Sequence, residues 1–136
     1  MIVIDSSVAL KWIFAEEKGV EQAVRIREAH VSGKNEIAVP ALFFYEIANV
    51  LAVQARLSTK EALEAIELVS AFELNVHDLD IAEYGEAMTF ARKHSVTVYD
   101  AGYHVLAGRL GCHFVTADRK FWEKVKGAGV AQLLAV

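Results

Sequence analysis

The sequence predicts an α/β domain in which helices cover both faces of a central, mostly parallel sheet. Short apolar runs typical of strands alternate with longer segments whose apolar residues recur about every 3.6 positions, as in helices. Of the 136 residues, 54% are hydrophobic, which is enough for one domain with a buried core. No linker, repeat or low-complexity segment divides the chain. We therefore expect residues 1–136 to form a single domain.

Five runs have strand character, and all but the last lead into a helical segment. Parallel strands need long crossover connections, so this alternation favours a parallel sheet over a series of hairpins. Sheets of this kind place their functional sites beyond the carboxyl ends of the strands. The expected strands are Ile2–Ile4, Ile37–Val39, 74–77, 113–116 and 132–134.

Helical periodicity and end signals predict the segments between the strands. Ser58 and Glu61 have capping-box spacing, and Asp80 is placed to cap the helix that follows it. Segment 41–56 is apolar almost all round, so we expect it to form a helical hairpin with segment 59–72. The expected helices span 6–14, 20–30, 41–56, 59–72, 80–93, 100–111 and 119–126.

Several classes of protein are not expected from this sequence. No apolar stretch approaches the roughly 20 residues of a membrane-spanning helix. The N-terminus does not have the pattern of a signal peptide, and the single Cys112 cannot form an internal disulfide. The histidines and Cys112 have no zinc-ligand spacing. We expect a protein of the cytoplasm without a membrane anchor.

Three aspartates stand where an apolar run meets a helical segment. These are Asp5, Asp100 and Asp118, and each alone is best explained as a helix N-cap. However, Ser6 or Ser7 could cap the first helix without Asp5. If each aspartate follows a parallel strand, all three lie at one edge of the sheet, where they would form a cation site.

Glu46 is a fourth acidic candidate because it stands within the apolar stretch 42–51. A buried carboxylate is costly unless it is paired, so Glu46 could pair with Asn49, pair with an arginine or face a metal ion. Hard divalent ions such as Mg²⁺ and Mn²⁺ prefer oxygen ligands. We expect Asp5, Glu46, Asp100 and Asp118 to hold Mg²⁺ or Mn²⁺ together.

The net charge of −4 argues against bulk electrostatic binding of nucleic acid. The objection weakens if four of the 18 acidic residues form a metal site, since the 14 acids left equal the 14 lysines and arginines. A bound cation would also reverse the local sign of the charge. Net charge therefore does not exclude a nucleic-acid substrate.

Four segments together resemble one known family, the PIN-domain ribonucleases, and within it the VapC-like toxins of prokaryotic toxin–antitoxin pairs. The segments are 2–8, 39–51, 99–107 and 115–121. The resemblance implies a PIN-like three-layer α/β/α sandwich whose four acids line a Mg²⁺ or Mn²⁺ pocket. It also implies hydrolysis of RNA by a metal-activated water, leaving a 5′-phosphate, and a cognate antitoxin as partner.

The family resemblance also suggests supporting residues. Ser6 follows the first aspartate and Thr116 precedes the last, and such hydroxyls would support the acids, although a helix cap and a strand residue explain them equally well. Arg119 and Lys120 could steer substrate phosphate or simply form a solvated face. The apolar helical hairpin predicts a homodimer or a higher homo-oligomer.

Two other functions stay open from the sequence. A receiver-like signalling module also combines alternating topology with a carboxylate site for Mg²⁺, but it clusters two acids at its first strand end, where this chain has Asp5 alone. A catalytically silent PIN-like module could bind a partner without hydrolysis, although retention of all four acids argues against it. Neither alternative is preferred over a metal-dependent ribonuclease.

Overall fold

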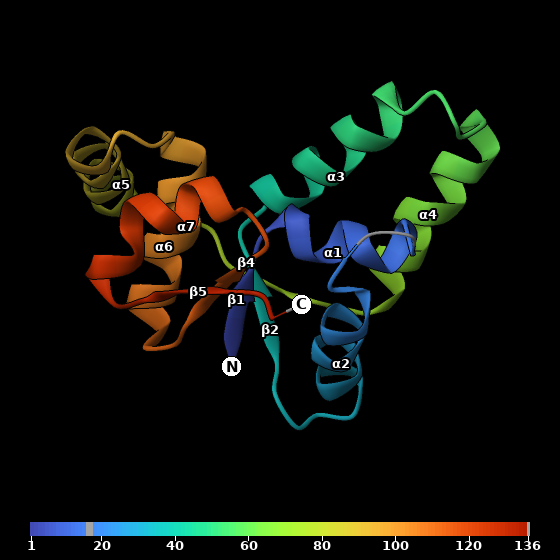
Figure 1. The fold of residues 1–136 in the computed structure, drawn as a ribbon, viewed down its shortest axis with the longest axis horizontal. Coiled ribbons are helices and arrows are strands. Elements are labelled where there is room, and N and C mark those ends of the chain that lie inside the picture. Colours follow the sequence, from blue (N-terminus) through green and yellow to red (C-terminus); the bar gives the residue numbers. More distant parts are fainter. Residues whose placement is uncertain (16–17, 136) are drawn as a thin grey trace.

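The computed structural model describes residues 1–15 and 18–135, and within them the strands form one five-stranded sheet. The strand order is β3-β2-β1-β4-β5, and every neighbouring pair is parallel (Figure 1). This order differs from the 2-1-3-4-5 order of receiver domains. The strands are β1 (Ile2–Ile4), β2 (Ile37–Val39), β3 (Asn75–Val76), β4 (Phe114–Thr116) and β5 (Ala131–Leu133).

Helices lie on both sides of the sheet, which confirms the predicted three-layer α/β/α arrangement. In Figure 1, α5, α6 and α7 lie to the left of the strands, whereas α1 to α4 lie to the right. None of the helices within residues 1–15 and 18–135 is long and apolar enough to cross a membrane. The helices are α1 (Ser6–Ile13), α2 (Val20–Val31), α3 (Leu42–Val53), α4 (Thr59–Ala71), α5 (Ile81–His94), α6 (Val98–Leu110) and α7 (Arg119–Val125).

The central strand β1 fixes the position of its neighbours. Val3 is in register with Ala38 on one side and with Phe114 on the other. All residues of β2 and β4 are buried, as expected for parallel strands covered on both faces. Because the pairing is parallel, β1, β2 and β4 end at one edge of the sheet, and the chain leaves that edge into α1, α3 and α7.

Helix α6 packs against the centre of the sheet. It contacts both β1 and β4, and the rings of Tyr103 and Phe114 stack with their centroids 5.5 Å apart. Tyr103 and Leu106 are fully buried. These contacts fix α6 against β1 and β4.

Several predicted boundaries differ from the structure by one to three residues, such as the end of α3 at Val53, and one of them concerns a candidate site residue. We expected Asp100 to follow an extended run and to begin a helix, but α6 already begins at Val98. Thr97 is the N-cap, and its Oγ1 accepts a hydrogen bond from the Asp100 backbone nitrogen at 3.1 Å. Val98 and Tyr99 of the apolar run 96–99 thus belong to the helix, and Asp100 lies within its first turn.

This geometry predicts different effects of substitutions at Thr97 and Asp100. Thr97→Ala should lower the free energy of unfolding by about 1 kcal/mol, the usual cost of losing an N-cap hydroxyl. Asp100→Asn should leave the free energy of unfolding unchanged or raise it, because Asp100 is not the cap. Urea denaturation in EDTA would measure both changes. A destabilised Asp100→Asn variant beside an unchanged Thr97→Ala variant would show that Asp100 caps the helix after all.

Candidate metal centre

Asp5 directly follows strand β1 and is the most buried of the four candidate acids, with 6% of its surface exposed. It is the N-cap of α1, and its Oδ1 accepts a hydrogen bond from the Ser7 backbone nitrogen at 3.1 Å. The Ser7 hydroxyl also donates to Oδ1, and the Thr116 hydroxyl donates to Oδ2 at 2.5 Å. These three bonds fix the orientation of the buried carboxyl group.

Ser7 and Thr116 connect β1 to the end of β4. The Ala117 backbone nitrogen donates to Ser7 Oγ at 2.9 Å, and the Asp118 backbone nitrogen donates to Thr116 Oγ1 at 3.1 Å. Thr116 thus contacts the Asp5 carboxylate, which is the supporting role suggested for it. The second hydroxyl that bonds to Asp5 belongs to Ser7 and not to Ser6, the residue we expected. The sequence could have indicated Ser7, because an aspartate side chain often accepts a hydrogen bond from the residue two positions later.

Glu46 lies one turn into α3 and is only partly buried, although its sequence surroundings are apolar. Its Oε1 accepts a hydrogen bond from the Tyr103 hydroxyl of α6. Asn49, which we considered as a partner, is exposed. Helical periodicity indicates only a core position for Tyr103, but a buried tyrosine hydroxyl usually needs a polar partner. Tyr103 is therefore a functional residue that the periodicity did not reveal.

Asp118 and Asp100 come from different helices at the same edge. Asp118 is the exposed N-cap of α7, and its Oδ1 accepts a hydrogen bond from the Phe121 backbone nitrogen at 3.0 Å. Burial raises the pKa of Asp100, repulsion from Asp118 raises it further, and the hydrogen bond with Thr97 lowers it. Asp118 thus serves as a helix cap while its charge acts on a second carboxylate.

Electrostatic repulsion connects the four acids. Burial raises the pKa of Asp5 to about 6; the hydrogen bonds from Ser7 and Thr116 oppose this rise, and the charges of Glu46 and Asp100 add to it. Burial likewise raises the pKa of Glu46. The hydrogen bond from Tyr103 lowers this pKa, and repulsion from the charge of Asp100 raises it further. The sheet edge therefore concentrates negative charge where burial disfavours it, and a cation would relieve that cost.

The described side chains do not form a closed metal cage. Within residues 1–15 and 18–135, no three Asp, Glu, His or Cys side chains converge closely enough to hold an ion together. Each acid nevertheless keeps acceptor capacity. A carboxylate has about four lone-pair sites, of which hydrogen bonds among the described residues use three on Asp5, one on Glu46 and one on Asp118. Mg²⁺ commonly binds one or two carboxylates and completes its shell with water and phosphate, so this donor set fits such an ion.

Basic side chains lie beside this acidic edge. Lys11, Lys18 and Arg119 line a hollow of about 300 Å³ together with Ala117, the residue bonded to Ser7. Lys11 follows Ser7 by four positions and thus lies on the same side of α1. Lys120 is exposed at the start of α7. Arg119, which the sequence suggested for steering substrate phosphate, therefore lies with two further basic residues that the sequence did not single out.

Comparison with known proteins shows similarity over nearly the whole chain. A sequence model of the PIN domain family matches residues 2–127. The protein named ribonuclease VapC3 from Pyrobaculum aerophilum is 35% identical over 127 residues, which cover 90% of this chain and 93% of that protein. The match is long enough and similar enough to establish family membership.

Solved structures share the fold at lower sequence identity. VapC20 from Mycobacterium tuberculosis, described as a sarcin-ricin loop cleaving toxin, superposes with a TM-score of 0.69 at 16% identity, covering 96% of each chain. A chain of a toxin–antitoxin complex from Klebsiella pneumoniae superposes with a TM-score of 0.69 at 10% identity, covering 97% of this chain and 96% of that one. At such identities the likeness concerns the fold alone.

The raised pKa of Asp5 predicts how the stability of the metal-free protein depends on pH. The folded protein binds this proton more tightly than the unfolded chain, whose aspartate pKa is about 3.9. The stabilisation is thus fully present below pH 4 and lost as the pH rises through about 6. The loss from Asp5 is about 3 kcal/mol, and Asp5→Asn should flatten the curve. Urea unfolding in EDTA from pH 4 to 7 measures it; equal slopes in both proteins would contradict the prediction.

Proposed function

We propose that this chain, which belongs to the PIN-domain family, is a metal-dependent ribonuclease that hydrolyses RNA phosphodiester bonds. The observation that carries the proposal is the Asp5 carboxyl group, which is buried among like charges and held in one orientation by Ser7 and Thr116. A helix cap alone needs neither that burial nor the two hydroxyls. The name of the relative, ribonuclease VapC3, supports the same reaction.

Asp5, Glu46, Asp100 and Asp118 would hold Mg²⁺ or Mn²⁺ in this proposal. Such an ion, when bound, lowers the pKa of a coordinated water and stabilises charge on the phosphoryl oxygens. The acids keep the oxygens that such an ion needs, because Glu46 uses only Oε1 and Asp118 only Oδ1 in hydrogen bonds within the described residues. Support for the ion therefore comes from the chemistry of the donors and the repulsion among them.

The surrounding residues would position these acids and the substrate. Ser7 and Thr116 restrict the rotation of Asp5, and Tyr103 restricts that of Glu46. The hollow lined by Lys11, Lys18 and Arg119 would attract the phosphates of the RNA strand, with Lys120 at its margin. This local positive charge would attract RNA although the net charge of the whole chain is negative.

The biological role follows from the same family membership. We infer that the chain is the toxin of a type II toxin–antitoxin pair that acts in the cytoplasm and is bound by a cognate antitoxin protein. Solved structures with this fold include a toxin–antitoxin complex, which supports a protein partner. The four retained acids argue for catalysis over a silent binding module.

We also infer a homodimer that forms through the α3–α4 hairpin. Figure 1 shows this hairpin projecting away from the sheet. Its exposed apolar residues are not covered by the rest of the described chain, and such a patch is typical of an interface. The residues are Tyr45, Val53, Leu63 and Leu68, with between 47% and 76% of their surface exposed.

Substitution of the acids tests the reaction. Asp5→Asn and Glu46→Gln should lower kcat/KM for RNA with Mn²⁺ by more than about a hundredfold, because even residues that support metal ligands contribute about 10- to 100-fold. Thr116→Val should cause a loss within that smaller range. Cleavage of a labelled single-stranded RNA, with and without EDTA, gives the rates.

Glu64→Gln is the matched control, because Glu64 is an exposed acid on α4 away from the sheet edge. It should retain full activity. Cleavage that is equal in wild type, Asp5→Asn and EDTA would show that a contaminating nuclease is responsible, and the proposed reaction would be abandoned.

Sedimentation tests the homodimer. The wild-type protein should sediment as a dimer at micromolar concentration, and Val53→Glu combined with Leu63→Glu should give a folded monomer, because each charge would have to be buried in the interface. Ile81→Glu is the control, since Ile81 is exposed on α5 and lies outside the hairpin. A monomeric wild type, or dissociation caused by Ile81→Glu alone, would count against this interface.

A further inference from the structure

A second hollow lies on the other side of α6 from Asp100. Its volume is about 260 Å³, slightly below the roughly 300–1,000 Å³ of pockets for drug-sized ligands, so it has room for one small group. The lining is largely apolar. It includes Pro40, Leu42, Leu79, Tyr84, Tyr99 and Gly102.

This hollow adjoins the acidic edge through two helices. On α3, Leu42 precedes Glu46 by one helical turn. On α6, Tyr99 immediately precedes Asp100. Successive helix residues are rotated by about 100°, so Tyr99 and Gly102 lie on one side of α6 and Asp100 on the other. A ligand that crosses the first turn of α6 would therefore reach the acids and the hollow at once.

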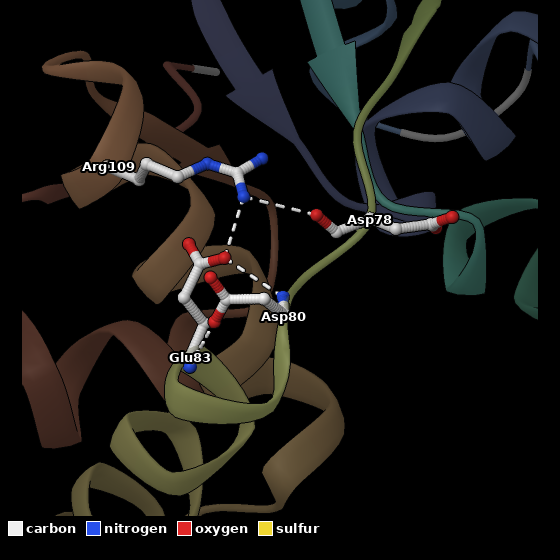
Figure 2. Close-up of polar contacts among 4 residues, drawn as sticks. All are labelled: Asp78, Asp80, Glu83 and Arg109. Atoms are coloured by element: carbon white, nitrogen blue, oxygen red, sulfur yellow. Dashed lines mark hydrogen bonds and ion pairs between the residues drawn. The ribbon is translucent and has the colours of Figure 1, made fainter.

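A polar network holds the walls of this hollow together. Arg109 of α6 donates to Glu83 Oε1 at 2.7 Å and to the Asp78 carbonyl oxygen at 3.1 Å. Asp80 and Glu83 form the capping box of α5. Figure 2 shows Arg109 between Glu83 and Asp78, which joins α5, α6 and the segment after β3. The hollow is thus formed before any ligand binds.

We propose that this hollow is a nucleobase subsite, which binds a base of the RNA next to the cleaved phosphate. The proposal rests on the ribonuclease function proposed above. Tyr84 and Tyr99 line the hollow while 52% and 64% of their surfaces stay exposed, so their rings are accessible for base stacking. An apolar pocket with aromatic rings suits the face of a base and not a phosphate group.

Asp78 gives the subsite a preference among bases. It is an acidic lining residue of the hollow, and Figure 2 shows its side chain directed away from Arg109 and Glu83. A carboxylate accepts hydrogen bonds only, so it favours a base edge with N–H donors. Guanine offers two adjacent donors, at N1 and N2, whereas uracil places carbonyl acceptors on both sides of its single N–H. We therefore expect guanine to bind better than uracil.

Nucleotide binding to the metal-free protein tests the subsite separately from cleavage. In EDTA, GMP should shift the backbone NMR signals of Tyr99 and Gly102, and UMP should shift them less at equal concentration. Tyr99→Ala should weaken GMP binding by about tenfold or more, as expected for loss of one stacking partner. Tyr99→Phe keeps the ring and should bind GMP as wild type does. Asp78→Asn should reduce the difference between GMP and UMP.

Cleavage assays provide the second readout. Tyr99→Ala should raise KM for RNA and reduce the dependence of kcat/KM on the base beside the cut, whereas Tyr99→Phe should retain both values. Met88→Ala is the control, because Met88 is as exposed as Tyr84 on the same helix but outside the hollow. If Tyr99→Ala lost binding of the antitoxin but bound GMP as the wild type does, the hollow would be a protein-docking surface, and the subsite would be overturned.

The outcomes separate the two proposals. If the wild-type protein cleaves RNA with Mn²⁺ but neither GMP binding nor base dependence changes in Tyr99→Ala, only the subsite is wrong. If the wild-type protein does not cleave RNA, the ribonuclease function is wrong, and the subsite that rests on it is overturned as well.

Discussion

The hydrogen bonds between Asp5 and the end of β4 are the interaction on which the rest of the site depends. Thr116 donates to Asp5 across the two central strands, and Ser7 accepts from the Ala117 backbone nitrogen. These contacts join Asp5, the N-cap of α1, to the segment that leads into α7, and they orient the buried carboxyl group of Asp5. The same hydrogen bonds therefore stabilise the fold and orient the Asp5 carboxyl group, so a change at Ser7 or Thr116 would affect stability and activity together.

The like charges at this edge of the sheet destabilise the metal-free fold, so apolar packing elsewhere must offset them. Burial and mutual repulsion both act against ionised Asp5, and the free protein tolerates this because the sheet and α6 are packed by large apolar contacts. Sites that perform chemistry commonly hold charges at a cost to stability. Here the cost falls on Asp5, Glu46 and Asp100, because burial raises the pKa of each of these carboxyl groups.

The sequence predicted the strands, the order of the helices and the segments that carry the four acids, because periodicity and caps are local signals. It did not predict that Thr97, two residues after an αL residue at Ser95, caps α6, since the run 96–99 suits either a strand end or a helix start. Nor could it identify the Tyr103 contact with Glu46 or the hollow beside Tyr99. Both depend on how α3, α5 and α6 pack, which no local pattern encodes.

The short outer strands have a consequence for how the protein assembles. β3 contains two residues and β5 contains three, so each free border of the sheet presents few backbone groups to which another strand could add. Extension of the sheet by a second chain is correspondingly unfavourable. Association must then use side chains on the helices, where surface charge and shape can discriminate between partners, instead of the backbone pairing that leads to uncontrolled polymerisation.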